Sequence, residues 1–258
     1  MQVLNKLNTA GDYQHPLGLT AQVFLAYAAE DCPRFEGDGQ ALPGQGNAAT
    51  VNALRQLLTT AQIPCWEFPR PWPSAVDPEA AMSRATEGCD NYLLVLSPHC
   101  LADALCLQGL LFALSLNKRI VPVLAEAVPM AHLPEPLQTL AAIDLRTAVP
   151  PLKQTSAGRQ ILKTLRHEAS YHRAHTQLLV KALQWERQLR DPTLLLRGNE
   201  LADYQRWVVR ASGRSRHQFI YLQVLYVAES ARQWSNRQGN NGSDFVPQGI
   251  GWLKHWVE

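Results

Sequence analysis

Histidine and cysteine side chains can bind a metal ion, and cysteines can also form disulfide bonds. His167, His172 and His175 are spaced five and three residues apart in a segment of helical composition. His172 and His175 could form a pair of metal ligands, but no third ligand is evident. We interpret them as histidines on the surface of a helix, and no metal site is predicted.

The cysteines argue against a disulfide framework, because their number is odd, and against a zinc site, because no two of them form a CxxC pair. Cys65 and Cys106 lie in apolar surroundings and are predicted to be small buried residues. No signal peptide opens the sequence, and no uncharged apolar run of about 18 residues could span a membrane. A reducing cytoplasm is the expected location. The five cysteines are Cys32, Cys65, Cys89, Cys100 and Cys106.

The acidic residues Glu30 and Asp31 form a turn directly after a strand-like run at residues 23–27. In open α/β sheets, ligands bind at the carboxyl ends of the strands. This turn is therefore a candidate ligand site.

A strand–helix–strand unit predicts the sheet that must position this turn. Residues 92–96 and 120–124 are apolar runs of strand formers, and residues 101–116 between them have helical composition. Such a βαβ unit places its two strands parallel in one sheet. Both strands are apolar without alternation, as expected when helices cover both faces of the sheet.

The remaining elements complete an α/β domain that is followed by helices. Further strands are predicted at residues 63–68 and 143–145, and further helices at residues 49–61 and 77–88, with Asp77 as N-cap. Long helices begin near residue 156. One or two helices are expected over residues 158–190, and others over residues 199–211 and 215–234.

The charge distribution also divides the chain. Residues 1–158 carry 9 Lys+Arg and 14 Asp+Glu, a balance of −5, whereas residues 159–258 carry 15 and 8, a balance of +7. The basic half could bind nucleic acid through its arginines, a function that we rank last, and solvated helix faces explain the charge more simply. These arginines are Arg206, Arg210, Arg214, Arg216 and Arg232.

Four segments, in order and at the right spacing, resemble the Toll/interleukin-1 receptor (TIR) domain. Residues 24–31 (FLAYAAED) resemble the first strand and its acidic turn, and residues 65–68 (CWEF) resemble the second strand with its common Trp66. Residues 89–98 resemble the element in which a small residue and Asp precede an apolar strand and Ser-Pro. Residues 116–123 (LNKRIVPV) are similar to the turn that leads to the next strand. The resemblance covers residues 23–150 and implies a flavodoxin-like doubly wound parallel sheet.

The second half of the chain is similar to the helical extension that follows TIR domains in many bacterial, especially cyanobacterial, signalling proteins. Residues 175–187 and 194–198 carry this likeness. We therefore divide the chain into a leader (1–20), a TIR domain (21–155), a helical extension (156–236) and a flexible tail (237–258).

The resemblance also implies an enzymatic activity, because many bacterial TIR domains cleave the glycosidic bond of NAD+. Their catalytic glutamate lies three residues after a cysteine that corresponds to Cys106, which places Gly109 at the glutamate position. Cleavage requires a carboxylate that stabilises the oxocarbenium-like charge, and glycine has none. Asp103 is the only acidic residue of this helix and lies about 120° away from position 109 around the helix axis.

The expected nucleotide pocket of the family is therefore degenerate here. Its positions correspond to Tyr27, Ala28, Glu30, Trp66, Cys106 and Gly109, and no catalytic residue is assigned. Ala26 and Ala28 replace serines of the family. The alternative is an NAD+ nucleosidase that uses a displaced acid, for which Glu30, Glu67 and Glu87 are the candidates.

The loop after the second strand mediates assembly in the family, and here it contains three prolines that stiffen it. Arg70, Pro71, Trp72 and Pro73 are therefore the candidate interface. Trp72 either is exposed as a contact residue or folds back onto the domain.

The helix at residues 101–116 is apolar nearly all round, which predicts that it is covered on both sides. The cover would be the extension helices or a second copy of the chain; alternatively, Gly109 reflects drift after the activity was lost. The sequence as a whole predicts a TIR signalling or assembly protein that associates with other TIR domains or with itself. No bound cofactor is expected, and NAD+ is the one candidate ligand or substrate.

Overall fold

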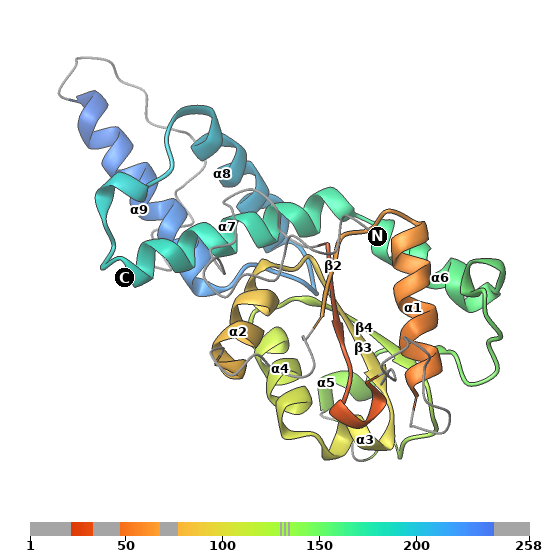
Figure 1. The fold of residues 1–258 in the computed structure, drawn as a ribbon. Coiled ribbons are helices and arrows are strands. Elements are labelled where there is room, and N and C mark those ends of the chain that lie inside the picture. The colour runs from red at the N-terminus through yellow and green to blue at the C-terminus, as the bar shows by residue number, and fades with distance from the viewer. Residues whose placement is uncertain are drawn as a thin grey trace, which may run out of the picture. The chain divides into compact units, whose positions relative to one another are not determined.

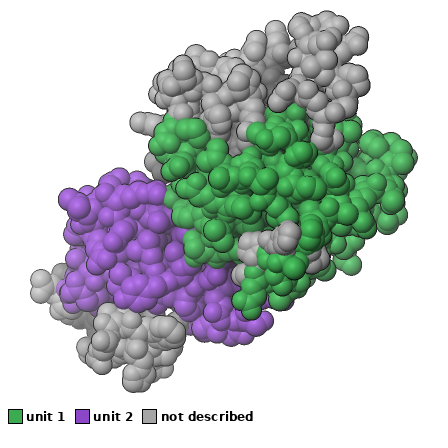
Figure 2. All heavy atoms as spheres, turned by 90° about the horizontal axis from the view of Figure 1, so that it is seen from below, with its two compact units in different colours: residues 1–115, 119–169 green, residues 116–118, 170–258 purple. Residues whose placement is uncertain are grey.

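The computed structural model of the chain describes residues 22–32, 47–67, 77–129, 131, 133 and 135–239. The predicted leader (1–20), the interface loop with Arg70, Pro71, Trp72 and Pro73, and the tail beyond residue 239 lie outside the described residues. The chain forms two compact units, shown in different colours in Figure 2. The first unit comprises residues 1–115 and 119–169, and the second comprises residues 116–118 and 170–258.

The first unit contains a five-stranded parallel sheet with the strand order β2-β1-β3-β4-β5. Figure 1 labels three of these strands, β2, β3 and β4. This order is the doubly wound, flavodoxin-like one, so the predicted fold class is confirmed. The strands are β1 (Val23–Ala26), β2 (Cys65–Glu67), β3 (Asn91–Leu96), β4 (Arg119–Leu124) and β5 (Ile143–Asp144). Cys65, predicted to be buried, is exposed, because β2 is an edge strand.

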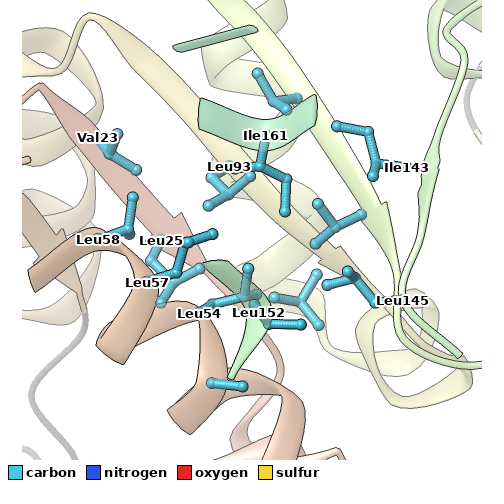
Figure 3. Packing of buried hydrophobic residues seen from close by; sticks show 14 of the residues in the cluster. Val23, Leu25, Leu54, Leu57, Leu58, Leu93, Ile143, Leu145, Leu152 and Ile161 are labelled. Atoms are coloured by element: carbon cyan, nitrogen blue, oxygen red, sulfur yellow. The ribbon is translucent and has the colours of Figure 1, made fainter. Parts of the chain in front are cut away.

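Alternate residues of the central strands build two separate cores, one on each face of the sheet. On one face, helix α1 (Ala48–Thr60) and helix α6 (Ser156–Arg166) cover Val23, Leu25 and Leu93. Figure 3 shows the helix residues of this core, which are Leu54, Leu57 and Leu58 of α1 and Ile161 of α6. Phe24, Tyr92 and Leu94 pack on the opposite face with helix α2 (Pro78–Gly88) and helix α4 (Ala104–Ser115). Burial on both faces explains why these strands lack a polar alternation.

The helix predicted over residues 101–116 is two helices, α3 (Pro98–Ala102) and α4. Asp103 separates them, and its Oδ1 accepts a hydrogen bond from the backbone N–H of Cys106 at 3.0 Å. A short acidic side chain satisfies a free N–H of a helix start, so Asp103 begins α4 rather than continuing α3. The N-cap predicted at Asp77 is confirmed, since its side chain accepts from the backbone of Glu79 and Ala80.

Helix α4 is apolar but is not covered on both sides within the described part of the first unit. Its inner face buries Cys106, Gly109, Leu110 and Ala113. Leu111 on its outer face is 56% exposed. The expected cover, by the extension helices or by a second copy of the chain, therefore stays a prediction.

A buried arginine joins the sheet to the end of α6. The guanidinium of Arg119 on β4 donates to Asn91 Oδ1 and to the backbone carbonyls of Leu165 and His167. Burial lowers the pKa of Arg119 to about 10, against the opposing effect of Asp90. The Arg119 side chain thus satisfies carbonyls that the last turn of a helix leaves without partners.

Short segments connect the elements of the first unit: η2 (Ala29–Asp31), α5 (Glu135–Gln138) and η4 (Leu152–Gln154).

The second unit is helical, with α7 (Ala169–Arg187), α8 (Gly198–Ser212) and α9 (Tyr221–Gly239) around a core of its own. Trp185, Trp207 and Tyr226 are the largest members of this core. The break predicted at Asp191-Pro192 is confirmed, because Asp191 caps the short helix η5 (Pro192–Leu194). Among the described helices, none combines the length and the hydrophobicity that a membrane crossing requires.

Candidate functional site at the inner face of α4

Gly109 lies on the inner face of α4, opposite α2 and β3. A Cβ atom built on Gly109 would lie 2.7 Å from Met82 Sδ and 2.7 Å from Tyr92 Oη. Real Cβ atoms do not approach other heavy atoms this closely. The volume into which a side chain at position 109 would project is therefore occupied by two side chains of the same unit.

Tyr92 is held in this position by an aromatic cluster. The ring of Phe24 lies edge-on to Tyr92, with centroids 5.0 Å apart, and to Trp66, with centroids 4.8 Å apart. Edge-to-face pairs of this kind fix the orientation of the rings. Burial raises the pKa of the Tyr92 phenol well above its ordinary value, so this hydroxyl stays neutral. The space beside the position that the resemblance assigns to a carboxylate thus contains an uncharged phenol.

The residues assigned to the nucleotide pocket do not all lie on one face. Ala28 and Cys106 belong to the core that contains Tyr92, and Trp66 packs against it. Tyr27 belongs to the opposite core, with α1. Glu30 is exposed in the turn η2. Strand alternation explains the separation of Tyr27, since consecutive side chains point to opposite faces.

Tyr27 takes part in a polar cluster with Glu67 and Arg55. Glu67 Oε2 accepts from Tyr27 Oη at 3.0 Å and from Arg55 Nε at 2.8 Å, and Arg55 also donates to Tyr27 Oη. Burial and the Glu67 carboxylate raise the pKa of Tyr27. The Glu67 carboxylate is thus engaged on the α1 side of the sheet, away from Gly109.

Two other carboxylates near the carboxyl ends of the strands hold loops together. Asp31 is fully buried and accepts from Ser97 Oγ at 2.5 Å and from the backbone N–H and side-chain amide of Asn47. Asp103 accepts from the N–H groups of Ala29 and Cys106. Both oxygens of each carboxylate have partners, which is typical of structural acids.

Glu87 lies at the other end of the sheet. It is buried near the end of α2, four residues before β3 begins. Of the three glutamates considered as displaced acids, Glu30 alone is exposed near the carboxyl ends of the strands.

Sequence reasoning identified position 109 but missed Met82 and Tyr92, which occupy the space beside it. Tyr92 was recognised only as a strand former, and Met82 only as part of a helix. The available signal was a Tyr at the start of an otherwise apolar strand, because a long side chain at such a position needs space in the facing helix.

Two of the three histidines that were expected on a helix surface, His172 and His175, are buried. His172 and His175 lie inside the second unit, where the ring of His175 contacts Trp207 and that of His172 contacts His217. The expectation of surface positions is wrong, because aromatic neighbours from α8 and from the segment before α9 enclose this face of α7. No group of three candidate metal ligands occurs in the described ranges.

The arginines of the basic half are partly engaged within the second unit. Arg206 pairs with Asp203, and Arg232 pairs with Glu229. The guanidinium of Arg214 lies 4.2 Å from the centre of the Tyr171 ring. Such contacts reduce the positive charge available to a polyanion.

Alanine at position 109 is expected to lower the free energy of unfolding by about 1 kcal/mol. Overpacking against Met82 and Tyr92 costs about 1–3 kcal/mol, and the helix gains about 1 kcal/mol when Ala replaces Gly. Denaturant unfolding should also show that Tyr92→Phe, which removes the closest rigid atom, makes Gly109→Ala less costly. Gly213→Ala is the matched control, since the nearest atom to its Cβ is 4.0 Å away. A stabilising Gly109→Ala in the presence of Tyr92 would contradict the close packing.

Comparison with known proteins identifies similarity to one family. A family model described as TIR domain matches residues 44–162. Among solved structures, the TIR domain of the Toll-related receptor TRR-2 from Hydra magnipapillata is similar at 20% identity and a TM-score of 0.43, over 57% of this chain and 99% of that one. A metazoan TIR-STING receptor from C. gigas is similar at 17% identity and a TM-score of 0.40, over 57% of this chain and 40% of that one. A search of curated proteins finds no match. The chain therefore contains a TIR domain, matched over residues 44–162, which is followed by helices.

Proposed function

We propose that this protein acts through protein–protein association of its TIR domain, with a second copy or another TIR domain, and does not cleave NAD+. One observation carries the proposal: Met82 Sδ and Tyr92 Oη occupy the space beside Gly109, the position that the sequence resemblance assigns to the family's glutamate. Cleavage of the glycosidic bond needs a carboxylate beside the developing positive charge. A neutral phenol does not supply it.

The other acidic residues support the same proposal. Glu67 is bonded to Arg55 and Tyr27 on the opposite face, and Asp31 and Asp103 accept hydrogen bonds at both oxygens. A carboxylate held in this way serves the fold rather than a substrate.

The purified chain, assayed at high concentration, is expected to release no more nicotinamide from NAD+ than a heat-denatured sample. High concentration matters because enzymes of this family often require assembly. Gly109→Glu alone should also be inactive, because its side chain has no free volume. Clear turnover by the unmodified chain would refute the proposal.

The alternative function is an NAD+ nucleosidase with a displaced acid, and the exposure of Glu30 at the carboxyl edge of the sheet is the observation in its favour. If turnover is found, Glu30→Gln should abolish it under this alternative. Glu79→Gln, on the first turn of α2, is the matched control because it removes one carboxylate elsewhere in the same unit.

Association has a candidate surface within the described residues. Leu111 is the exposed large apolar residue of α4, and Leu107 and Phe112 beside it are half-buried. Leu111→Glu is expected to reduce concentration-dependent association in sedimentation velocity. Gln108→Glu is the control, since it adds the same charge to the same exposed face one turn earlier. The loop with Arg70 and Trp72 is the second candidate, from the sequence alone.

A further inference from the structure

Two of the five cysteines lie in contact where α3 meets α4. The sulfur atoms of Cys100 and Cys106 are 3.0 Å apart, and no disulfide bond joins them. A disulfide bond is about 2.05 Å long, so a movement of roughly 1 Å would bring these sulfurs to bonding distance. The pair is therefore close to the geometry of a disulfide without being one.

The two helix starts hold the backbone of this pair in place. The N–H of Cys100 donates to Ser97 Oγ, and the N–H of Cys106 donates to Asp103 Oδ1, each at 3.0 Å. Each N-cap side chain thus accepts a hydrogen bond from the backbone of one cysteine. The caps are in turn held by other residues: Ser97 donates to Asp31, and Asp103 accepts from the backbone N–H of Ala29. The caps fix the separation of the two thiols, so little chain entropy remains to be lost when a bond forms.

The remaining cysteines do not share this arrangement. Cys65 is exposed on an edge strand, and Cys89 is buried with its thiol bonded to the carbonyl of Thr86. The sulfur atoms of Cys100 and Cys106 are already in contact at 3.0 Å. An intramolecular disulfide of the folded unit is therefore expected at this pair.

We propose that Cys100 and Cys106 are a reversible dithiol–disulfide pair that is oxidised by a hydroperoxide. The Cys106 thiolate, from the more exposed residue (4% against 1%), attacks one peroxide oxygen, the O–O bond breaks, and a sulfenic acid and water form. The Cys100 thiolate then attacks the Cys106 sulfur, the S–O bond breaks, the S–S bond forms and a second water leaves. In sum, two thiols and one hydrogen peroxide give one disulfide and two waters.

Oxidation links the first turn of α4 to α3 across Asp103. A disulfide stabilises mainly by restricting the unfolded chain, and even this short loop should raise the Tm of the first unit by about 5 °C. The disulfide is a modification of the α3–α4 corner, and it does not depend on whether the TIR domain cleaves NAD+.

The test treats the purified, folded chain with hydrogen peroxide, blocks free thiols with an alkylating agent and identifies linked peptides by mass spectrometry. The expected result is one major cross-linked species, Cys100–Cys106, that has lost two hydrogen atoms and disappears on treatment with dithiothreitol. The same sample should show the higher Tm before reduction and the original Tm afterwards. No substitution is needed, so misfolding of a variant does not affect this result.

Variants then assign the effect to the pair. Cys100→Ala should abolish the Tm shift caused by peroxide, whereas Cys65→Ala, which removes the exposed thiol, should leave it unchanged. The proposal is overturned if the alkylating agent still labels Cys100 and Cys106 while Cys65 is oxidised. It is equally overturned if the pair is converted to sulfinic or sulfonic acids without a linked peptide.

Discussion

Alanine in place of Gly158 is expected to lower the free energy of unfolding of the first unit by about 3 kcal/mol or more. A Cβ on Gly158 would lie 1.9 Å from the backbone oxygen of Leu152 and 2.5 Å from its carbonyl carbon. These atoms belong to the backbone of η4 and cannot rotate away as a side chain does. Helix α6 or η4 must therefore move, which disturbs the core that contains Leu152 and Ile161.

The close approach has a local cause. Thr155 is the N-cap of α6, and its Oγ1 accepts a hydrogen bond from the N–H of Gly158 at 3.0 Å. The same hydroxyl donates to the carbonyl of Leu152 at 2.8 Å. The cap thus draws the first turn of α6 onto the preceding turn, and only a residue without a side chain fits between them.

Chemical denaturation followed by circular dichroism measures this effect. Ser156→Ala is the matched control, because Ser156 is exposed two residues earlier in the same helix, and its change is expected to stay within about 0.5 kcal/mol. If Gly158→Ala and Ser156→Ala unfold at the same denaturant concentration, α6 does not approach η4 as closely as the structure shows.

The fold could be predicted from the sequence because its signals are local. Apolar runs of five or six residues, such as residues 92–96 and 120–124, have the length of strands, and the segment between them has helical length and composition. Parallel pairing follows, since a connection of this kind leaves both strands pointing in one direction. The order of the strands in the sheet came from the resemblance to a family rather than from the strands themselves.

The break between α3 and α4 shows where local reasoning fails. Residues 101–116 have helical composition throughout, and Asp103 was interpreted as a charge on the helix rather than as its start. The choice depends on a distant partner, because Asp103 Oδ2 accepts from the N–H of Ala29, 74 residues earlier. That contact stabilises the cap, and no pattern within α4 indicates it.

The contact between Cys100 and Cys106 depends on the same break. In one continuous helix, residues six apart lie about 120° from each other around the axis and do not touch. The change of direction at Asp103 brings their sulfur atoms to 3.0 Å. A sequence interpretation that assumes a single helix therefore separates two thiols that the structure places in contact.

Position 109 was identified from the sequence, but its surroundings were not. A glycine among leucines and alanines could reflect either a close approach or the loss of an unneeded side chain. The structure places Met82 and Tyr92 against it, from α2 and β3. These residues are 27 and 17 positions away, and single-sequence patterns do not report such pairings.

Acid is expected to destabilise the second unit through His175. Burial, followed by the nearby positive charge of Lys118, lowers the pKa of His175 from 6.5 to about 3. His175 Nε2 lies 3.2 Å from the carbonyl oxygen of Gln218, and a carbonyl only accepts, so Nε2 carries the proton of the neutral ring. Lys118 is itself buried and donates to Thr176 Oγ1, and the other titratable groups nearby are His172 and His217. None of these groups is an anion, so none would compensate a positive charge on His175.

The direction of the effect follows from proton binding. Above pH 6.5 the histidine is neutral in both folded and unfolded chains and does not affect stability. Between pH 6.5 and about 3 the unfolded chain binds a proton that the folded unit excludes, so stability falls as the pH falls. Each pH unit costs about 1.4 kcal/mol, which amounts to about 3 kcal/mol at pH 4.

Hydrogen exchange followed by mass spectrometry can measure this in peptides from α7 and α8, separately from the first unit. Protection in these peptides should decrease from pH 7 to pH 4, after correction for the intrinsic exchange rate, more than in peptides from β3 and β4. His175→Gln should weaken this dependence, because glutamine donates to the Gln218 carbonyl without titrating. His167→Gln is the control, since the His167 side chain is 69% exposed. If His175→Gln and the unmodified chain lose protection in parallel, a different group is responsible for the acid sensitivity, and His175 accepts its proton inside the folded unit.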